Sequence, residues 1–225
     1  MLGDLARHDD IETRGGPPLE LPARFGGWLW ARTPEAAVFA ARLWAFARTE
    51  PDGWQLEAGP AFELKLARVE LELSPVVTRA TGQIGWVETI DAGAPDEQVV
   101  IGRRDLEKLD VTVRGTVVLL RDLTFQTTAQ ALAARANYSR YRELVDGGPD
   151  EAVDYPDRDA DFARTDVRLQ ALLRWEYLPG STLFAVYTLI GFTDGPARSL
   201  GGSLRELADP EREQRFVLKL SHRFG

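Results

Sequence analysis

The sequence predicts an all-β fold, an antiparallel meander of about nine strands. Three observations lead to this prediction. Apolar and polar residues alternate over long runs, as the two-residue period of a half-buried strand requires. Short turn sequences separate several consecutive runs, as hairpins require. The connections between the other runs are longer and polar, so that short and long connections alternate along the chain.

The clearest strand lies between residues 164 and 178. One face is apolar, with Val167, Leu169, Ala171, Leu173, Trp175 and Tyr177, and the other is polar, with Arg168, Gln170, Arg174 and Glu176. Pro179-Gly180 then supplies a tight turn. The strand that follows, 181–193, is apolar on both faces, so its sequence alone does not show which face is which.

The same alternation marks the other strands, although less regularly. We predict nine strands, near residues 26–33, 37–48, 54–66, 69–90, 97–120, 123–135, 164–178, 181–193 and 214–224. Residues 1–25 are expected to form an irregular lead-in, and residues 26–225 one partial β-barrel domain. Because single-chain bacterial barrels usually have an even number of strands, we expect nine strands to form a curved open sheet or an imperfectly closed one.

Two alanine-rich segments leave a helix open as an alternative. Thr33 to Thr49 begins with a possible N-cap followed by proline, and Thr127 to Gly148 ends in two glycines. Both patterns favour a helix on local grounds. A soluble α+β domain or a β-sandwich therefore stays open as the competing fold.

The connection lengths favour a barrel of the outer-membrane type. The tight connections are 33–36, 67–68, 121–122 and 179–180, and the longest polar ones are 136–163 and 194–213. Short turns on one side and long loops on the other are typical of such barrels. If the tight turns are periplasmic, the last strand ends in the periplasm as well. The longest apolar stretch, Thr182 to Phe192, is about half of the ~20 residues that a transmembrane helix needs.

Composition argues against several classes of function. The chain has 35 acidic and 27 basic residues and a net charge of −8, so we expect no nucleic-acid partner. It has no cysteine, which excludes thiol catalysis and cysteine-based metal sites. Ser221 and His222 are adjacent, and strand alternation puts them on opposite faces. We predict no catalytic residue and no cofactor.

Two sets of residues are candidate sites. Asp157, Asp159 and Asp161 space carboxylates as calcium loops do, but the glycine turn and closing glutamate of an EF-hand are absent. We interpret them as part of a solvated acidic loop, with calcium binding as the weaker alternative. The second set, Trp175, Tyr177, Phe216 and Phe224, has the residue types of the aromatic girdles that lie at membrane interfaces.

Four stretches together resemble a known family. They are VVIGRRDLEKLDVTVRG, DLTFQTTAQALAARANYSRYREL, LRWEYLPGSTLFAVYT and the terminal FVLKLSHRFG. They are similar to the C-terminal barrel of a bacterial family labelled a domain of unknown function (number 5916). The most specific piece is the motif formed by Arg174, Trp175, Glu176, Tyr177, Pro179, Gly180 and Ser181.

The resemblance implies the C-terminal part of an outer-membrane β-barrel in a Gram-negative cell. Family members typically carry an N-terminal module similar to family-9 carbohydrate-binding domains. The expected partners are the lipid bilayer, the missing N-terminal part of the same protein, and the barrel-insertion machinery, which would recognise the C-terminal strand. We expect ligand passage or binding without catalysis. The alternatives are a soluble binding domain and a non-catalytic part of a carbohydrate-active hydrolase.

Overall fold

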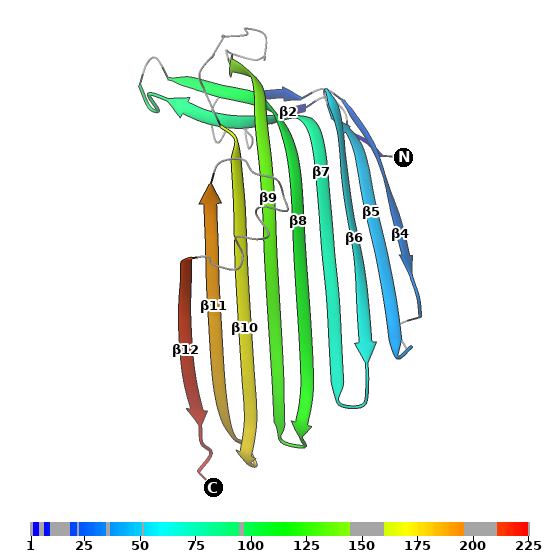
Figure 1. Ribbon diagram of the computed structural model, residues 1–225, viewed down its shortest axis with the longest axis vertical. Coiled ribbons are helices and arrows are strands. Elements are labelled where there is room, and N and C mark those ends of the chain that lie inside the picture. The colour runs from blue at the N-terminus through cyan, green and yellow to red at the C-terminus, as the bar shows by residue number, and fades with distance from the viewer. Residues whose placement is uncertain are drawn as a thin grey trace.

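One large antiparallel sheet makes up most of the structure (Figure 1). The computed structural model describes residues 2–4, 7–9, 19–21, 23–34, 37–50, 52–94, 97–144, 160–195 and 211–224. Nine strands form the main sheet: β4 (Arg24–Arg32), β5 (Phe39–Glu50), β6 (Gly53–Lys65), β7 (Val69–Ile90), β8 (Gln98–Leu120), β9 (Leu123–Leu144), β10 (Phe162–Leu178), β11 (Ser181–Gly195) and β12 (Glu211–Ser221). Each pairs antiparallel with its neighbours in the sequence, which confirms the predicted all-β meander.

Three short strands precede these nine. β1 (Leu2–Asp4) pairs with the start of β4, and β2 (Arg7–Asp9) pairs with β3 (Leu19–Leu21) in a separate two-stranded sheet. The segment expected to be irregular therefore contains some strand. The described residues contain no helix, and none of them forms a segment able to cross a bilayer as a helix.

Both segments for which a helix stayed open are strands. β5 covers most of the first, and β9 runs through the second as far as Leu144. The predicted end of β9 at residue 135 was wrong by nine residues, because Ala136 to Leu144 continues the ladder with the start of β8. Tertiary pairing on both edges overrides the helix propensity of alanine here.

Cross-strand register sorts the side chains of the nine strands onto two faces. Residues directly opposite each other in antiparallel strands share a face. One row runs through Ala41, Phe62, Leu73, Val113 and Ala129. The neighbouring row on the other side runs through Ala40, Glu63, Glu72, Arg114 and Thr128. We call the first side the apolar face and the second the polar face.

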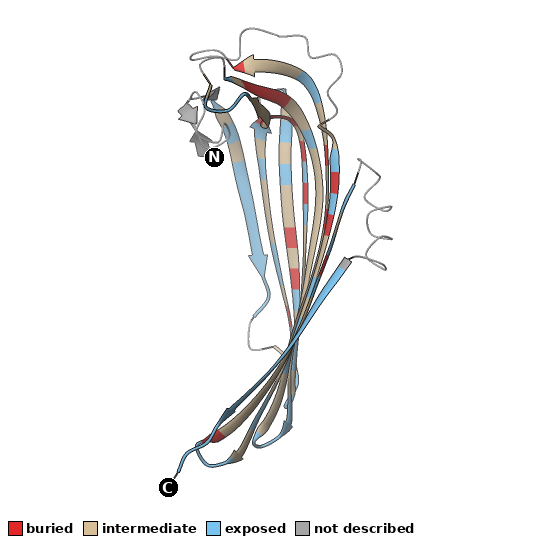
Figure 2. Ribbon diagram, turned by 90° about the vertical axis from the view of Figure 1, so that its left-hand side faces the viewer, coloured by how far each residue is buried: buried red, intermediate tan, exposed pale blue. Residues whose placement is uncertain are grey.

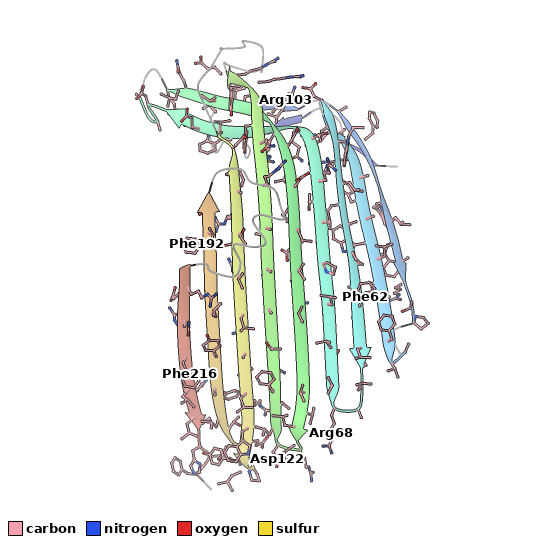
Figure 3. The ribbon with its side chains drawn as sticks, viewed as in Figure 1. Phe62, Arg68, Arg103, Asp122, Phe192 and Phe216 are labelled. Carbon is pink, nitrogen blue, oxygen red and sulfur yellow. The ribbon has the colours of Figure 1, made fainter. Side chains whose placement is uncertain are left out.

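The two ends of the sheet differ. The tight connections β6–β7, β8–β9 and β10–β11 all lie at the lower end in Figure 1, which we call the turn end. Arg68 and Asp122 mark two of these turns (Figure 3). The connections at the opposite end include the two longest, β9–β10 and β11–β12, although β5 and β6 are joined there by only two residues. The sheet is open, since β12 pairs only with β11 among the described strands.

At the upper end, β7 and β8 bend away from the direction of the sheet and form an overhang, residues 83–90 and 98–104 (Figures 1 and 2). A bulge between Ala80 and Gln83 produces the bend in β7. Most buried positions gather in this upper half (Figure 2). They include a small apolar cluster of Ile84, Val99, Ile101 and Leu144, against which Trp86 packs.

Ion pairs join the overhang to the β5–β6 hairpin. Arg103 Nε lies 2.7 Å from Asp52 Oδ2, and Arg140 contacts the same oxygen at 3.4 Å. Burial lowers the pKa of the Arg103 guanidinium, and the Asp52 carboxylate opposes that effect. Figure 3 places Arg103 at this end of the molecule.

Gly82 makes the bulge possible. Its φ is +65°, and a Cβ atom there would lie 2.5 Å from the carbonyl carbon of Asp52. Gly93 also has a positive φ, +82°, but no atom lies within 4 Å of the position that its Cβ would take.

We expect Gly93→Ala to cost about 1–2 kcal/mol of unfolding free energy from backbone strain alone. Gly82→Ala should cost about 1–3 kcal/mol more, because it also overpacks the contact with Asp52.

Urea unfolding of the refolded chain measures both costs. Equal losses for the two variants would contradict the claim that close packing against Asp52 holds the bend.

Candidate functional site

The apolar face is uncharged over a continuous band of the sheet. On β8 the band includes Leu109, Val111, Val113 and Val117, and on β10 it includes Val167, Leu169, Leu173 and Trp175. From Leu109 to Val117 it covers nine residues, which matches the ~9–11 that a tilted strand needs to cross a bilayer. Many large side chains in this band are exposed, among them Leu73 at 40%, Phe62 at 39% and Leu218 at 60%. Figure 3 shows Phe62 and Phe216 on strands at opposite sides of the sheet.

Charged residues mark both limits of the band. At the upper limit, Arg79, Glu107 and Arg135 stand opposite one another on β7, β8 and β9, with Nε–Oε distances of 3.8 and 3.7 Å. At the lower limit, the exposed residues Arg68 and Asp122 lie in the tight turns. On β7, β8 and β9 the apolar face thus changes to charge at one row, and on β12 it does so lower, at Arg212, which stands opposite Gly191.

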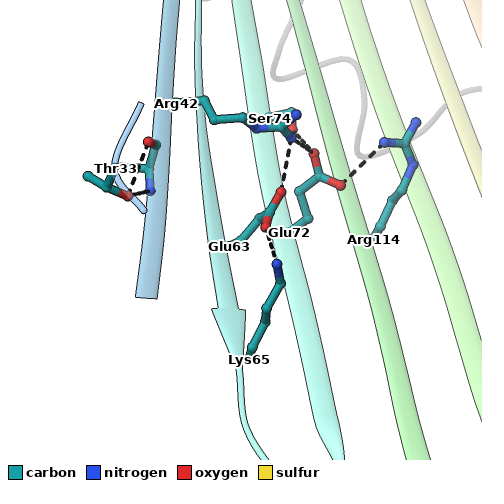
Figure 4. Close-up of polar contacts among 8 residues, drawn as sticks. Thr33, Arg42, Glu63, Lys65, Glu72, Ser74 and Arg114 are labelled. Atoms are coloured by element: carbon teal, nitrogen blue, oxygen red, sulfur yellow. Dashed lines mark hydrogen bonds and ion pairs between the residues drawn. The ribbon is translucent and has the colours of Figure 1, made fainter. Parts of the chain in front are cut away.

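The polar face carries charges at the height where the apolar face carries none (Figure 4). Glu63 and Glu72 stand directly opposite each other, an arrangement that would be destabilising without counter-charges. Arg42 Nη2 reaches both carboxylates, at 3.2 and 2.8 Å. Lys65 Nζ lies 2.9 Å from Glu63, and Arg114 Nη1 lies 3.4 Å from Glu72. These ion pairs form one network across β5, β6, β7 and β8.

Two hollows lie on the polar face. One, of about 120 Å³, lies between β9, β10 and β11 and is lined mainly by threonine and glutamine. The other, of about 260 Å³, lies at the upper end, where the strands β4 to β8 contribute side chains. We call the second one the cationic hollow, because Arg24, Arg48, Arg104 and Lys108 line it together with the single acid Glu57.

At the turn end, the β10–β11 hairpin holds the C-terminal residues. The Tyr177 hydroxyl lies 2.9 Å from His222 Nδ1, and the two rings stack. Ser181 is only 1% exposed; its hydroxyl accepts a hydrogen bond from the backbone N–H of Arg223 at 3.1 Å and lies 3.3 Å from His222 Nδ1. Phe224 packs edge-on against His222. The side chains of the hairpin and of the C-terminal segment therefore lock together.

The rest of the motif shapes this hairpin. Gly180 has a φ of +77°, and a Cβ there would lie 2.9 Å from the Arg223 side chain. Its N–H donates to Glu176 Oε1 at 3.1 Å. Glu176 also contacts Arg174 at 3.6 Å. The motif that is most specific in the sequence thus builds a turn and a docking point for the residues that follow β12.

The structure brings most of the predicted girdle residues together. Trp175 and Tyr177 contact edge to face, and Phe224 joins Tyr177 through His222. Phe216 stands opposite Tyr187, in the middle of the band, and so does not belong to this group. His222 was missed as a member of the cluster, because its contact with Tyr177 spans 45 positions in the sequence.

The calcium candidate lies mostly outside the described residues. Asp157 and Asp159 lie outside the described residues, and Asp161 accepts a hydrogen bond from the backbone N–H of Tyr138. Within the described part of the chain, no group of three or more His, Cys, Asp or Glu side chains could hold a metal ion. No local sequence pattern predicts the cationic hollow, because its residues are distributed over five strands.

Comparison with known proteins gives one match. The sequence model of the family described as Domain of unknown function (DUF5916) matches residues 5–222. No curated protein and no solved structure matches the chain.

The buried serine of the turn motif supports a stability prediction. Ser181→Ala leaves the Arg223 N–H without its acceptor, so we expect a loss of about 1–3 kcal/mol of unfolding free energy. Ser221→Ala, an exposed serine on β12, is the matched control and should cost less than ~0.5 kcal/mol. Urea unfolding of both variants tests this, and a Ser181 variant as stable as the control would contradict the docking role.

Proposed function

Because the chain belongs to the family described as Domain of unknown function (DUF5916), its function must be inferred from its own geometry, and we propose that the sheet is part of an outer-membrane β-barrel. In this proposal the apolar face contacts lipid and the polar face lines a lumen that binds or passes a ligand. The sheet itself performs no catalysis. The association with a family-9-like carbohydrate-binding module stays a prediction from the resemblance.

The contrast between the two faces at one height supports this proposal most directly. Phe62, Leu73 and Val113 occupy one row of the apolar face. Their sequence neighbours Glu63, Glu72 and Arg114 occupy the row behind them. A charge facing lipid near mid-bilayer costs about 2–4 kcal/mol for Lys or Arg, whereas a lumen-facing one is hydrated. The strands place apolar residues on one face and charged residues on the other, which is the arrangement that the cost of a lipid-facing charge favours.

A soluble sandwich would bury its apolar face beneath a second sheet. Among the described residues, strand contacts run almost entirely between neighbours in the one large sheet, and the second sheet is the three-residue pair β2–β3. No observation favours the hydrolase alternative. Exposed apolar area of this extent needs lipid or a partner to cover it.

The open edges point to further strands. An unpaired strand edge in the hydrocarbon core costs several kcal/mol for each unsatisfied backbone group. β12 has a neighbour on one side only, and β4 has β1 along just its first three residues. We propose that additional strands, expected from the same protein, pair with these edges and complete the barrel.

A pair of adjacent substitutions tests the assignment of faces. Leu169 lies on the apolar face at the height of Val113, and Gln170 is the next residue, on the polar face. Leu169→Arg should destabilise the chain folded in phospholipid vesicles by about 2–4 kcal/mol, because it places a charge against lipid. Gln170→Arg should change this stability by less than ~1 kcal/mol, since its side chain faces water. Equal losses for both variants would rule out a lipid-facing apolar face.

The C-terminal strand gives a second test, of recognition by the insertion machinery. Phe216, Leu218 and Leu220 share a face of the edge strand β12, and Phe224 follows it. Such a strand can be captured by addition to a partner sheet. We expect Phe224→Ala to reduce assembly in outer-membrane fractions several-fold, measured by heat-modifiable gel mobility.

Phe192→Ala is the matched control, because Phe192 is an exposed aromatic near the other end of β11. Normal assembly of the Phe224 variant, or an equal defect in the Phe192 variant, would contradict a recognition role.

A further inference from the structure

The cationic hollow stands out from the rest of the polar face. In the network around Glu63 and Glu72, on the same face, carboxylates and cations are paired. The hollow instead has four cations in its wall and one acid, Glu57. A chain whose net charge is −8 thus concentrates positive charge at one place.

The neighbouring carboxylates offset only part of this charge. Glu50, whose side chain is fully buried, pairs with Arg24 at 3.1 Å and with Arg48 at 2.9 Å. Arg104 donates to the neutral side chain of Gln83 at 3.1 Å. Within the described part of the chain, neither Arg104 nor Lys108 has a carboxylate at ion-pair distance. Two cations of the wall therefore have no counter-charge among the residues that the structure describes.

The same wall also contains buried polar side-chain atoms that have no hydrogen-bond partner among the described residues. These atoms are Arg24 Nε, Arg104 Nε and Thr78 Oγ1. Thr78 is 4% exposed. Buried polar atoms in native proteins are almost always paired, so three unpaired ones around one hollow need an explanation. Arg24 Nε and Arg104 Nε can only donate, and the Thr78 hydroxyl can donate or accept, so one acceptor group would satisfy all three.

We propose that the cationic hollow binds the oxyanion group, carboxylate or phosphate, of a small ligand. The guanidinium groups of Arg24 and Arg104 and the Thr78 hydroxyl donate to the oxyanion, and Lys108 supplies charge. The inference deepens the proposed function, and rests on it for the route by which a ligand reaches the polar face. The cationic hollow lies at the upper end of the sheet, beneath the overhang, and therefore at one mouth of the proposed lumen.

Isothermal titration of the full chain, folded in detergent micelles at low ionic strength, tests the proposal. The probes are inorganic phosphate, glucuronate and, as the neutral counterpart of glucuronate, glucose. We expect one or both anions to bind and glucose not to bind. Phosphate binding without glucuronate binding identifies a phosphate site, and the reverse identifies a carboxylate site.

Three variants locate the binding. Arg104→Gln should weaken anion binding at least tenfold. Thr78→Val removes a hydroxyl that has no internal partner, so it should weaken binding without lowering the stability of the fold. Arg121→Gln makes the same charge change in the exposed β8–β9 turn and should bind as the unaltered chain does.

The proposal is overturned if no anion binds to the folded chain, if glucose binds as well as glucuronate, or if the Arg104 and Thr78 variants bind normally. These outcomes are separable from failure of the barrel proposal. Binding in detergent does not require insertion into vesicles, and the Leu169 and Gln170 variants report on insertion alone.

Discussion

A continuous register within the uncharged band, kept from strand to strand across the sheet, is the constraint on which the rest of the structure depends. Because each strand pairs antiparallel with its neighbours and opposite residues share a face, the side of one strand fixes the side of all the others. A shift of one residue between β7 and β8 would bring Glu72 and Arg114 onto opposite faces of the sheet. The uncharged band and the ion-pair network therefore exist only together.

Bulges relax this register where the band ends. Below Ala80 the pairing of β7 and β8 is regular, and above it the bulge at Gly82 turns both strands into the overhang. The buried apolar cluster around Ile84 and Ile101 lies beyond that point, as in a small soluble core. One pair of strands thus carries an exposed apolar face below the bulge and a small buried apolar cluster above it.

The sequence predicts the parts of the fold that local alternation determines. The strand around Leu169 could be assigned to its faces because charged or polar residues occupy every second position except that of Leu172. β11 could not, because Phe184, Val186 and Ile190 on its polar face are as apolar as the residues on the other face. Only pairing with Arg174 and Arg168 on β10 shows which side they occupy. In β9, alanine fits both a helix and a strand, and the neighbouring strands decide.

The candidate sites were harder to predict, because they depend on contacts between segments that are distant in the sequence. The sequence motif around Trp175 could be recognised as a turn with aromatic residues, but its role in holding His222 and Arg223 depends on a contact between distant segments. The cationic hollow combines Arg24 with Lys108, residues on strands that do not touch each other. No local pattern in the sequence contains that combination.

The direction of the edge strands limits how a barrel can be completed. Eight successive antiparallel pairings separate β4 from β12, so these two strands run the same way. Joined directly, they would make a parallel seam in an otherwise antiparallel sheet. If every pairing in the closed barrel is to be antiparallel, an odd number of further strands must lie between β12 and β4. β1, which is antiparallel to β4 and hence to β12, has the right polarity to be the first of these.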